Sequence, residues 1–333
     1  MEYKHLRKQV DILDCIKGIA SINIIILHSN ILAADSIFYL LFVIMAVPMF
    51  LICSGFNFSR RITDGTWKKL YEPHKLYERF LRFTIPIVIT YGMYIIGISY
   101  LQKQAITLYD LIIRFLTCNF GPGAYYYSIM LQFLIIFPVL YKTIYYYGKK
   151  GLLLIAVINF IYEYLCEIFA WGGDGYELCI IRYLTLISCG IYIFFYRIEN
   201  KVVLVTIMLA GVYYQVLLPL IGYTYRIFTR WSNTSMVVSL WIFPILWMVI
   251  DKFRDRVFQN AVIVFLGYVG KASYYIFCVQ IIYYCFIEGW ICTNSNLIQE
   301  NPWIRMMAAI VFCVFCGIFF YEVLKKKKSI GGN

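Results

Sequence analysis

The chain has 333 residues, of which 62% are hydrophobic and only 14% are charged, and this composition excludes an ordinary soluble domain. The formal net charge of +12 does not indicate a nucleic-acid partner, because the basic residues lie between apolar runs and form no basic module. The three histidines show no metal-ligand spacing, so we expect no metal site. The composition predicts an all-α, polytopic membrane protein.

Apolar windows of about 20 residues predict about ten transmembrane helices. Gly267, Gly270 and Lys271 interrupt the ninth window, which favours a short amphipathic piece followed by a true span from Ser273. We expect a single membrane-embedded domain over residues 1–333, with short tails at 1–12 and 325–333. The ten windows lie at 13–34, 37–57, 83–101, 127–147, 151–170, 179–196, 201–222, 236–251, 260–287 and 303–324.

The distribution of lysine and arginine predicts how these helices are oriented. With a cytoplasmic N-terminus, 22 of the 30 Lys and Arg residues fall in cytoplasmic segments and 6 fall outside. An even number of spans also places both termini in the cytoplasm. We therefore expect a multi-pass protein of the cell membrane, in contact with membrane lipids, with both termini cytoplasmic.

The first window carries polar residues on one side of an otherwise apolar helix. At about 100° per residue, Asp14, Lys17, Ser21 and His28 fall within roughly 60° of one another. Ionisable groups inside a membrane are costly and are candidates for function. His28 is a candidate general base, and Lys17 is a candidate partner of Asp14 or of an anionic ligand. The alternative is that Asp14 and Lys17 lie at the membrane edge and His28 bonds a neighbouring helix.

Two later segments carry further candidates. VPMFLICSGF, residues 47–56, contains Ser54-Gly55, where a helix can kink or a neighbouring helix can approach closely, and Arg60 follows it at the cytoplasmic side; ordinary helix packing also explains this segment. Arg79 and Arg82 lie three residues apart at the mouth of the third window, where guanidinium groups can hold phosphate bidentately. Topology signals and contacts with lipid headgroups are the alternatives.

Residues 121–141 carry an aromatic candidate for binding a sugar. Gly-Pro-Gly predicts a tight turn, and three tyrosines then enter the membrane from the outer side. Tyr126 and Tyr127 offer flat ring faces to a sugar, and Gln132 lies about one and a half turns beyond Tyr127. An interfacial aromatic belt predicts the same residues.

LDCIKGIASINIIILH, residues 13–28, resembles the opening signature of the acyltransferase type 3 family, integral-membrane O-acyltransferases that modify surface glycans and some small molecules. Asp14, Lys17, Gly18 and His28 stand at the signature positions, with Lys17 where the family usually has Arg. Segments 47–56, 78–86, 125–138 and 270–277 are similar to later motifs of the family, in the same order.

Two departures from the family motifs affect the candidate site. Tyr126 or Tyr127 replaces a Trp, and Gln280 stands where many members have His. His28 is therefore the one candidate base inside the membrane. The chain carries no segment similar to a fused hydrolase-like domain, so the resemblance implies a stand-alone transferase.

The resemblance implies transfer of an acyl group, acetyl in the first instance, from cytoplasmic acyl-CoA to a glycan or lipid-linked sugar. His28 would act on the acceptor hydroxyl. Asp14 and Lys17 would complete the catalytic set further along the helix, with Lys17 about 16 Å from His28 and too far away to touch it. Arg79, Arg82, Arg60 and Ser54 would bind the donor. The acceptor would lie near Tyr126, Tyr127 and Gln132, and no bound cofactor is expected.

A glycan transporter or flippase is the alternative from another functional class. No inverted repeat is visible in the sequence, and the basic residues favour one side of the membrane, so the alternative has less support.

Overall fold

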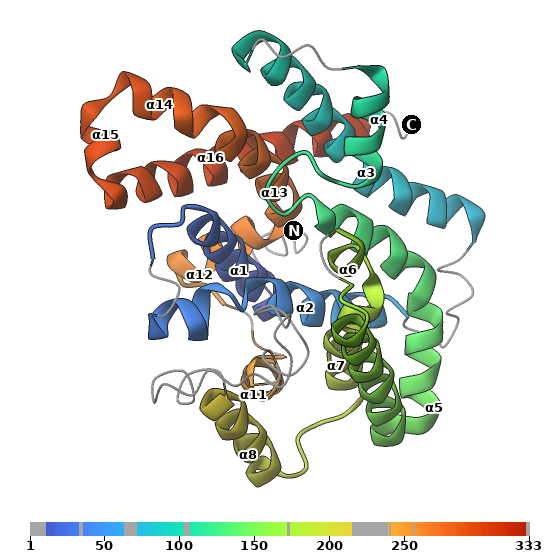
Figure 1. Ribbon diagram of the computed structural model, residues 1–333. Coiled ribbons are helices and arrows are strands. Elements are labelled where there is room, and N and C mark those ends of the chain that lie inside the picture. Colours follow the sequence, from blue (N-terminus) through green and yellow to red (C-terminus); the bar gives the residue numbers. More distant parts are fainter. Residues whose placement is uncertain are drawn as a thin grey trace.

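The computed structural model describes residues 11–32, 36–62, 72–102, 107–171, 174–214, 239, 241–254, 256 and 258–330. Every regular element in these ranges is helical, in agreement with the predicted all-α class (Figure 1). The principal helices are α1 (Ile12–His28), α2 (Ala46–Arg60), α3 (Pro73–Gly97), α4 (Leu108–Leu116), α5 (Tyr125–Ile168), α7 (Leu184–Phe195), α8 (Lys201–Val212), α11 (Ile242–Phe253), α12 (Ala261–Lys271), α13 (Ser273–Ile282) and α16 (Pro302–Ile330). The short helices are α6 (Asp174–Glu177), α14 (Glu288–Asn294) and α15 (Asn296–Glu300). Three π-helices, η2 (Tyr39–Val43), η4 (Ile98–Gln102) and η7 (Tyr283–Ile287), and one 3-10 helix, η5 (Ile180–Tyr183), complete the described elements.

Five helices of the described ranges are long and apolar enough to cross a membrane. Each predicted window coincides with at least one helix, although parts of the first, seventh and eighth windows lie outside the described residues. The fourth and fifth windows form one helix, α5, which turns sharply at Gly148, where φ is 49°. The count of ten crossings stays a prediction. The five helices are Tyr39–Arg60, Pro73–Tyr100, Tyr125–Ile168, Ser273–Asn294 and Pro302–Lys326.

The ninth window is divided between two helices, as its glycines predicted. α12 ends at Lys271, Ala272 has φ −87° and ψ 0°, and α13 begins at Ser273. The long apolar helix begins at Ser273, and the segment before it is a short apolar helix. This junction brings Lys271 to the surface of a central cavity.

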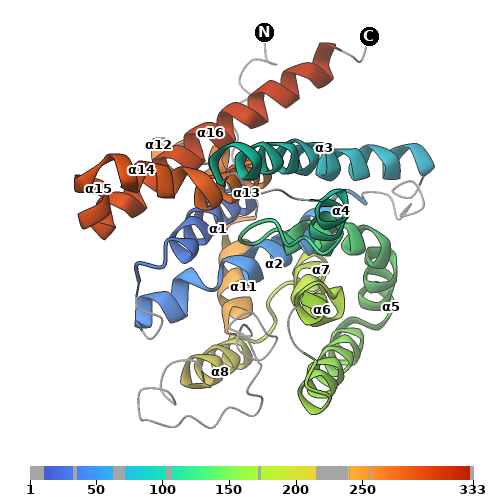
Figure 2. The same cartoon turned by 45° about the horizontal axis from the view of Figure 1, so that its top comes forward.

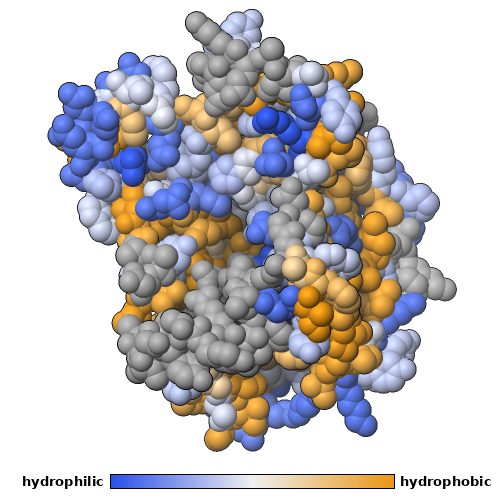
Figure 3. Space-filling view, viewed as in Figure 1, coloured by the Kyte–Doolittle hydropathy of each residue, from blue (hydrophilic) through white to orange (hydrophobic). Residues whose placement is uncertain are grey.

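Apolar side chains cover much of the outer surface, as they do where a protein faces lipid. On α16, exposed apolar residues recur every four positions from Met307 through Val311 and Phe315 to Phe319. Figure 3 shows apolar residues over much of one face, with hydrophilic residues gathered over α14 and α15. The long apolar helices and the apolar outer surface are those of a membrane protein.

α1 and α2 lie near the centre of the molecule and contact each other (Figures 1 and 2). α12 packs along α1, and α7 packs along α2. Close approach of the backbones at glycine positions makes the first of these contacts possible: a Cβ atom at Gly270 would lie 1.7 Å from the Asp14 carbonyl oxygen, and one at Gly18 would lie 2.1 Å from the Leu266 carbonyl oxygen. The crossing therefore fixes the first turns of α1 against the end of α12.

Candidate functional site

A cavity of about 190 Å³ lies between α1, α2, α3, the start of α5 and the junction of α12 with α13. α2 faces it with a regular stripe in which lining residues recur three or four positions apart, from Val47 and Phe50 to Ser54, Asn57 and Arg61. The spacing is that of one helix face, so the whole length of α2 contributes to the wall.

One end of the cavity is strongly cationic. Five basic side chains line the cavity, and no Asp or Glu of the described residues joins them. The Phe58 ring lies between two of them, with its centroid 5.5 Å from the Arg61 guanidinium carbon and 5.6 Å from that of Arg79. The excess of positive charge makes this end suited to an anionic ligand. The five side chains are Lys17, Arg61, Arg79, Arg82 and Lys271.

The neighbouring positive charges alter the pKa of Arg61. Loss of contact with water, followed by the positive charges of Arg82, Arg79 and Arg60, lowers the pKa of Arg61 to about 10. Arg61 therefore remains charged at neutral pH, and a bound anion would relieve the repulsion among the guanidinium groups.

His28 marks the opposite end of the cavity. Lys17 and His28 both line it from α1, and eleven residues of helix separate them by about 16 Å along the axis. Apolar side chains, among them Ile24, Leu27 and Met130, line the length between the two groups. A cationic end and an imidazole thus share one largely apolar passage.

Tertiary contacts hold His28 in place. The Tyr284 ring lies 6.0 Å from the imidazole, and the Tyr284 hydroxyl donates a hydrogen bond to the Ile25 carbonyl, one turn before His28. On the other side, Gly123 faces the imidazole from the turn before α5. His28, the last residue of α1, therefore packs against the π-helix Tyr283–Ile287 and faces the turn that precedes α5.

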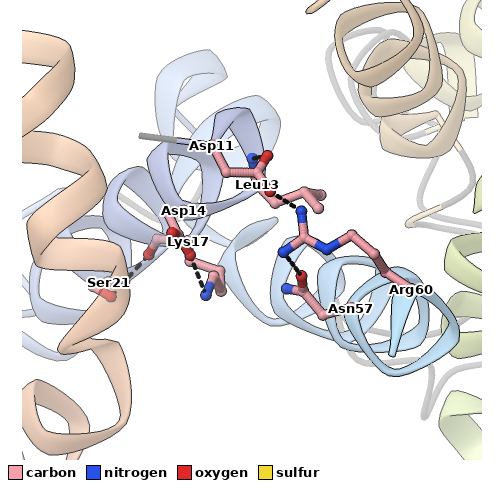
Figure 4. Close-up of polar contacts among 7 residues, drawn as sticks. All are labelled: Asp11, Leu13, Asp14, Lys17, Ser21, Asn57 and Arg60. Atoms are coloured by element: carbon pink, nitrogen blue, oxygen red, sulfur yellow. Dashed lines mark hydrogen bonds and ion pairs between the residues drawn. The ribbon is translucent and has the colours of Figure 1, made fainter. Parts of the chain in front are cut away.

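The residues of the predicted polar stripe on α1 do not all line the cavity, because some of them bond within the helix. Lys17 lines the cavity and pairs with Asp14, with 2.7 Å between ammonium and carboxylate (Figure 4). Ser21 is buried and donates a hydrogen bond to the Lys17 carbonyl oxygen. The structure brings Lys17 and His28 to one cavity and places Asp14 as the partner of the lysine.

Of the four predicted donor-binding residues, Arg79, Arg82 and Ser54 line the cavity and Arg60 does not. Arg60 turns away to pair with Asp11 and to donate a hydrogen bond to Asn57 (Figure 4). The ion pair joins the end of α2 to the start of α1. The position of Arg60 therefore gives no support to a role in binding the donor.

Of the three predicted acceptor residues, only Tyr126 lines the cavity. Its ring centroid lies 6.1 Å from that of Phe50 and 5.7 Å from that of Phe277. Tyr127 is buried in an aromatic cluster, with its hydroxyl 3.1 Å from that of Thr84. Gln132 donates to the Leu178 carbonyl and accepts from the Ile180 amide, so it fixes the segment before α7. Neither position supports contact with an acceptor.

Comparison with known families identifies the family of the chain. The acyltransferase type 3 model, described as an acyltransferase domain, matches residues 10–322. The chain belongs to this acyltransferase family. No curated protein and no solved structure matches it.

Two cationic residues of the acyltransferase cavity were not among the candidates taken from the sequence. Arg61 lies seven residues after Ser54, two helical turns along the same face, and this spacing could have distinguished it from Arg60. Lys271 reaches the cavity only because α12 crosses α1 at Gly18 and Gly270. No local pattern in the sequence predicts that crossing.

Proposed function

We propose that this membrane acyltransferase moves an acyl group, acetyl in the first instance, from cytoplasmic acyl-CoA to a hydroxyl group of a cell-surface or lipid-linked glycan. The observation that supports this function best is the shared cavity, which five cationic side chains and His28 line together. Lys17, one of the five, lies about 16 Å from His28 along α1. An acyl-CoA molecule has the matching distribution of chemistry, with phosphate groups at one end and a thioester at the end of a long, uncharged arm.

The cationic end suits the phosphate groups of the donor. Arg61, Arg79 and Arg82 can each give charge-assisted hydrogen bonds to phosphate, and Lys17 and Lys271 add point charges. The excess of Lys and Arg in the segments before and after the predicted spans supports a cytoplasmic location for this end, and with it both termini. The donor would then enter from the compartment that contains CoA.

The imidazole end suits the transfer step. A neutral His28 nitrogen takes the proton from the acceptor hydroxyl, whose oxygen attacks the thioester carbonyl carbon. The carbon–sulfur bond breaks after the new carbon–oxygen bond has formed, and the departing thiolate receives the proton from His28. An ester and free CoA are the products, and His28 returns to its starting state.

Tyr126 supports the proposed class of acceptor. Tyr126 lines the cavity close to Ser54 and can stack against a sugar ring, and the family resemblance supports a glycan or lipid-linked sugar. The expected location is the cell membrane, with the acceptor presented at the outer side.

Purified protein in lipid nanodiscs, supplied with acetyl-CoA carrying a labelled acetyl group and a membrane-glycan extract, tests the proposal. We expect label to leave CoA and to appear in glycan as an ester that mild alkali releases. His28→Ala should lower the rate by about 10²- to 10⁴-fold, the usual contribution of a positioned base. Arg60→Ala should retain the rate, because Arg60 lies outside the cavity.

A transporter makes the opposite prediction. If label stays on CoA while the glycan crosses the nanodisc or vesicle membrane, the protein moves its ligand without acyl transfer and the proposal fails. Unchanged transfer by the His28→Ala variant would remove His28 from the chemistry.

A further inference from the structure

The turn before α5 places a glycine next to His28. Gly123 has φ +80°, a conformation that L side chains rarely adopt, and it lines the cavity. A Cβ atom at Gly123 would lie 3.6 Å from the His28 Nε2 atom and 3.1 Å from the Phe277 ring. Glycine thus leaves this side of the imidazole without a side chain, where a Cβ atom would crowd the Phe277 ring.

A second nitrogen faces the same position. The Gln280 Nε2 atom lies 3.9 Å from the Cβ position of Gly123, and Gln280 stands one turn after Phe277 on α13. The Gln280 side chain is 1% exposed, and its Nε2 atom has no hydrogen-bond partner. A buried amide donor without a partner costs about 1–3 kcal/mol, so its presence requires an explanation.

We propose that the Gln280 side-chain amide donates a hydrogen bond to the carbonyl oxygen of the acyl group that is being transferred, beside Gly123. This proposal rests on the acyl-transfer function proposed above and assigns a second catalytic residue to the same site. The geometry places a proton acceptor and a hydrogen-bond donor around one point, as acyl transfer requires.

The amide acts as negative charge develops. When the acceptor oxygen attacks, the carbonyl π electrons move onto the carbonyl oxygen, and the Gln280 N–H stabilises that oxygen. When the carbonyl re-forms, the carbon–sulfur bond breaks and the thiolate leaves. Gln280 neither gains nor loses a proton in this sequence. A fixed donor in a site with little water stabilises the oxyanion more than it stabilises the neutral carbonyl.

Gln280→Met tests the proposal, because methionine is similar in length and has no N–H donor. We expect kcat for acetyl transfer to fall about 10²- to 10³-fold, the usual effect of losing one oxyanion donor. KM for acetyl-CoA should change little, because the phosphate-binding end is untouched. Gln280→His, which keeps an N–H donor, should recover much of the lost rate, and Gln299→Met on the exposed helix α15 should match the wild type.

Thermal unfolding separates this role from a structural one. Removal of a buried donor that has no partner should leave the melting temperature of Gln280→Met unchanged or raised, whereas a structural glutamine would lower it. Gln280→Leu repeats the comparison should Gln280→Met fail to fold. If a folded variant without the Gln280 donor keeps the wild-type kcat, the role assigned to Gln280 is wrong, and the proposed acyl transfer is unaffected. A wild-type protein that never removes the acetyl group from CoA overturns the proposed function as well.

Discussion

Two adjacent arginines at the end of α2 give a matched test of where the acyl donor binds. Arg61 lines the cavity and flanks the Phe58 ring, whereas Arg60 points away and pairs with Asp11. We expect Arg61→Gln to raise KM for acetyl-CoA and to leave kcat nearly unchanged, because a contact with distant phosphate is made equally in the ground state and the transition state.

The size of the effect follows from the kind of contact that is lost. A hydrogen bond between charged groups contributes about 1.5–3 kcal/mol, and Arg61 is partly open to water, so the lower part of that range applies. About 1.5 kcal/mol corresponds to a rise in KM of roughly tenfold. Arg60→Gln removes an exposed ion pair with Asp11 and an exposed hydrogen bond to Asn57, and neither involves the proposed donor. The exposed ion pair contributes at most about 1 kcal/mol to stability, and KM should stay within about twofold of wild type.

Initial rates measured across a range of acetyl-CoA concentrations supply both constants. Repeating the series at increasing salt should raise KM more for the wild type than for Arg61→Gln, since salt screens the charge that the variant lacks. A larger KM effect in Arg60→Gln than in Arg61→Gln would refute the placement of the phosphate groups in this cavity.

Two further predictions concern the framework around the site. Gln132→Leu removes the hydrogen-bond partner of the Leu178 carbonyl and of the Ile180 amide. We expect the free energy of unfolding to fall by about 2–4 kcal/mol and KM for acetyl-CoA to stay unchanged. A raised KM at wild-type stability would instead indicate that Gln132 binds the ligand. Gly270→Ala places a Cβ atom 1.7 Å from the Asp14 carbonyl oxygen and should destabilise the protein by about 3 kcal/mol or more. The control Gly92→Ala, whose Cβ atom would have nothing within 4 Å, should be neutral or stabilising by up to about 1 kcal/mol. Equal melting temperatures of the two variants would contradict the close crossing of α1 and α12.

Local patterns in the sequence predicted the features that depend on one helix. The i, i+3 spacing of Asp14 and Lys17 predicted their ion pair, and the helical arithmetic that aligned Lys17 with His28 agrees with their shared cavity. The glycines of the ninth window predicted the break before Ser273. In each case the relevant partners lie within a few turns of one another.

Features that depend on packing between distant segments could not be predicted in the same way. Tyr126 and Tyr127 are neighbours in sequence and differ by about 100° around α5, and only the packing of α3 and α13 determines which one faces the cavity. Gln132 has its partners more than forty residues away, between α6 and α7. The same limit applies to Lys271, whose place depends on the α1–α12 crossing.

The central claim is that a single cavity holds the donor, with its phosphate groups among Arg61, Arg79 and Arg82 and its acyl group beside His28. The most direct measurement is a structure of the protein with a thioether analogue of acetyl-CoA, which cannot transfer its acyl group. We predict density for phosphate within hydrogen-bonding distance of at least two of the three arginines, with the analogue's carbonyl between the His28 and Gln280 nitrogens at Gly123. Phosphate density elsewhere on the protein, or a carbonyl remote from His28, would contradict the claim.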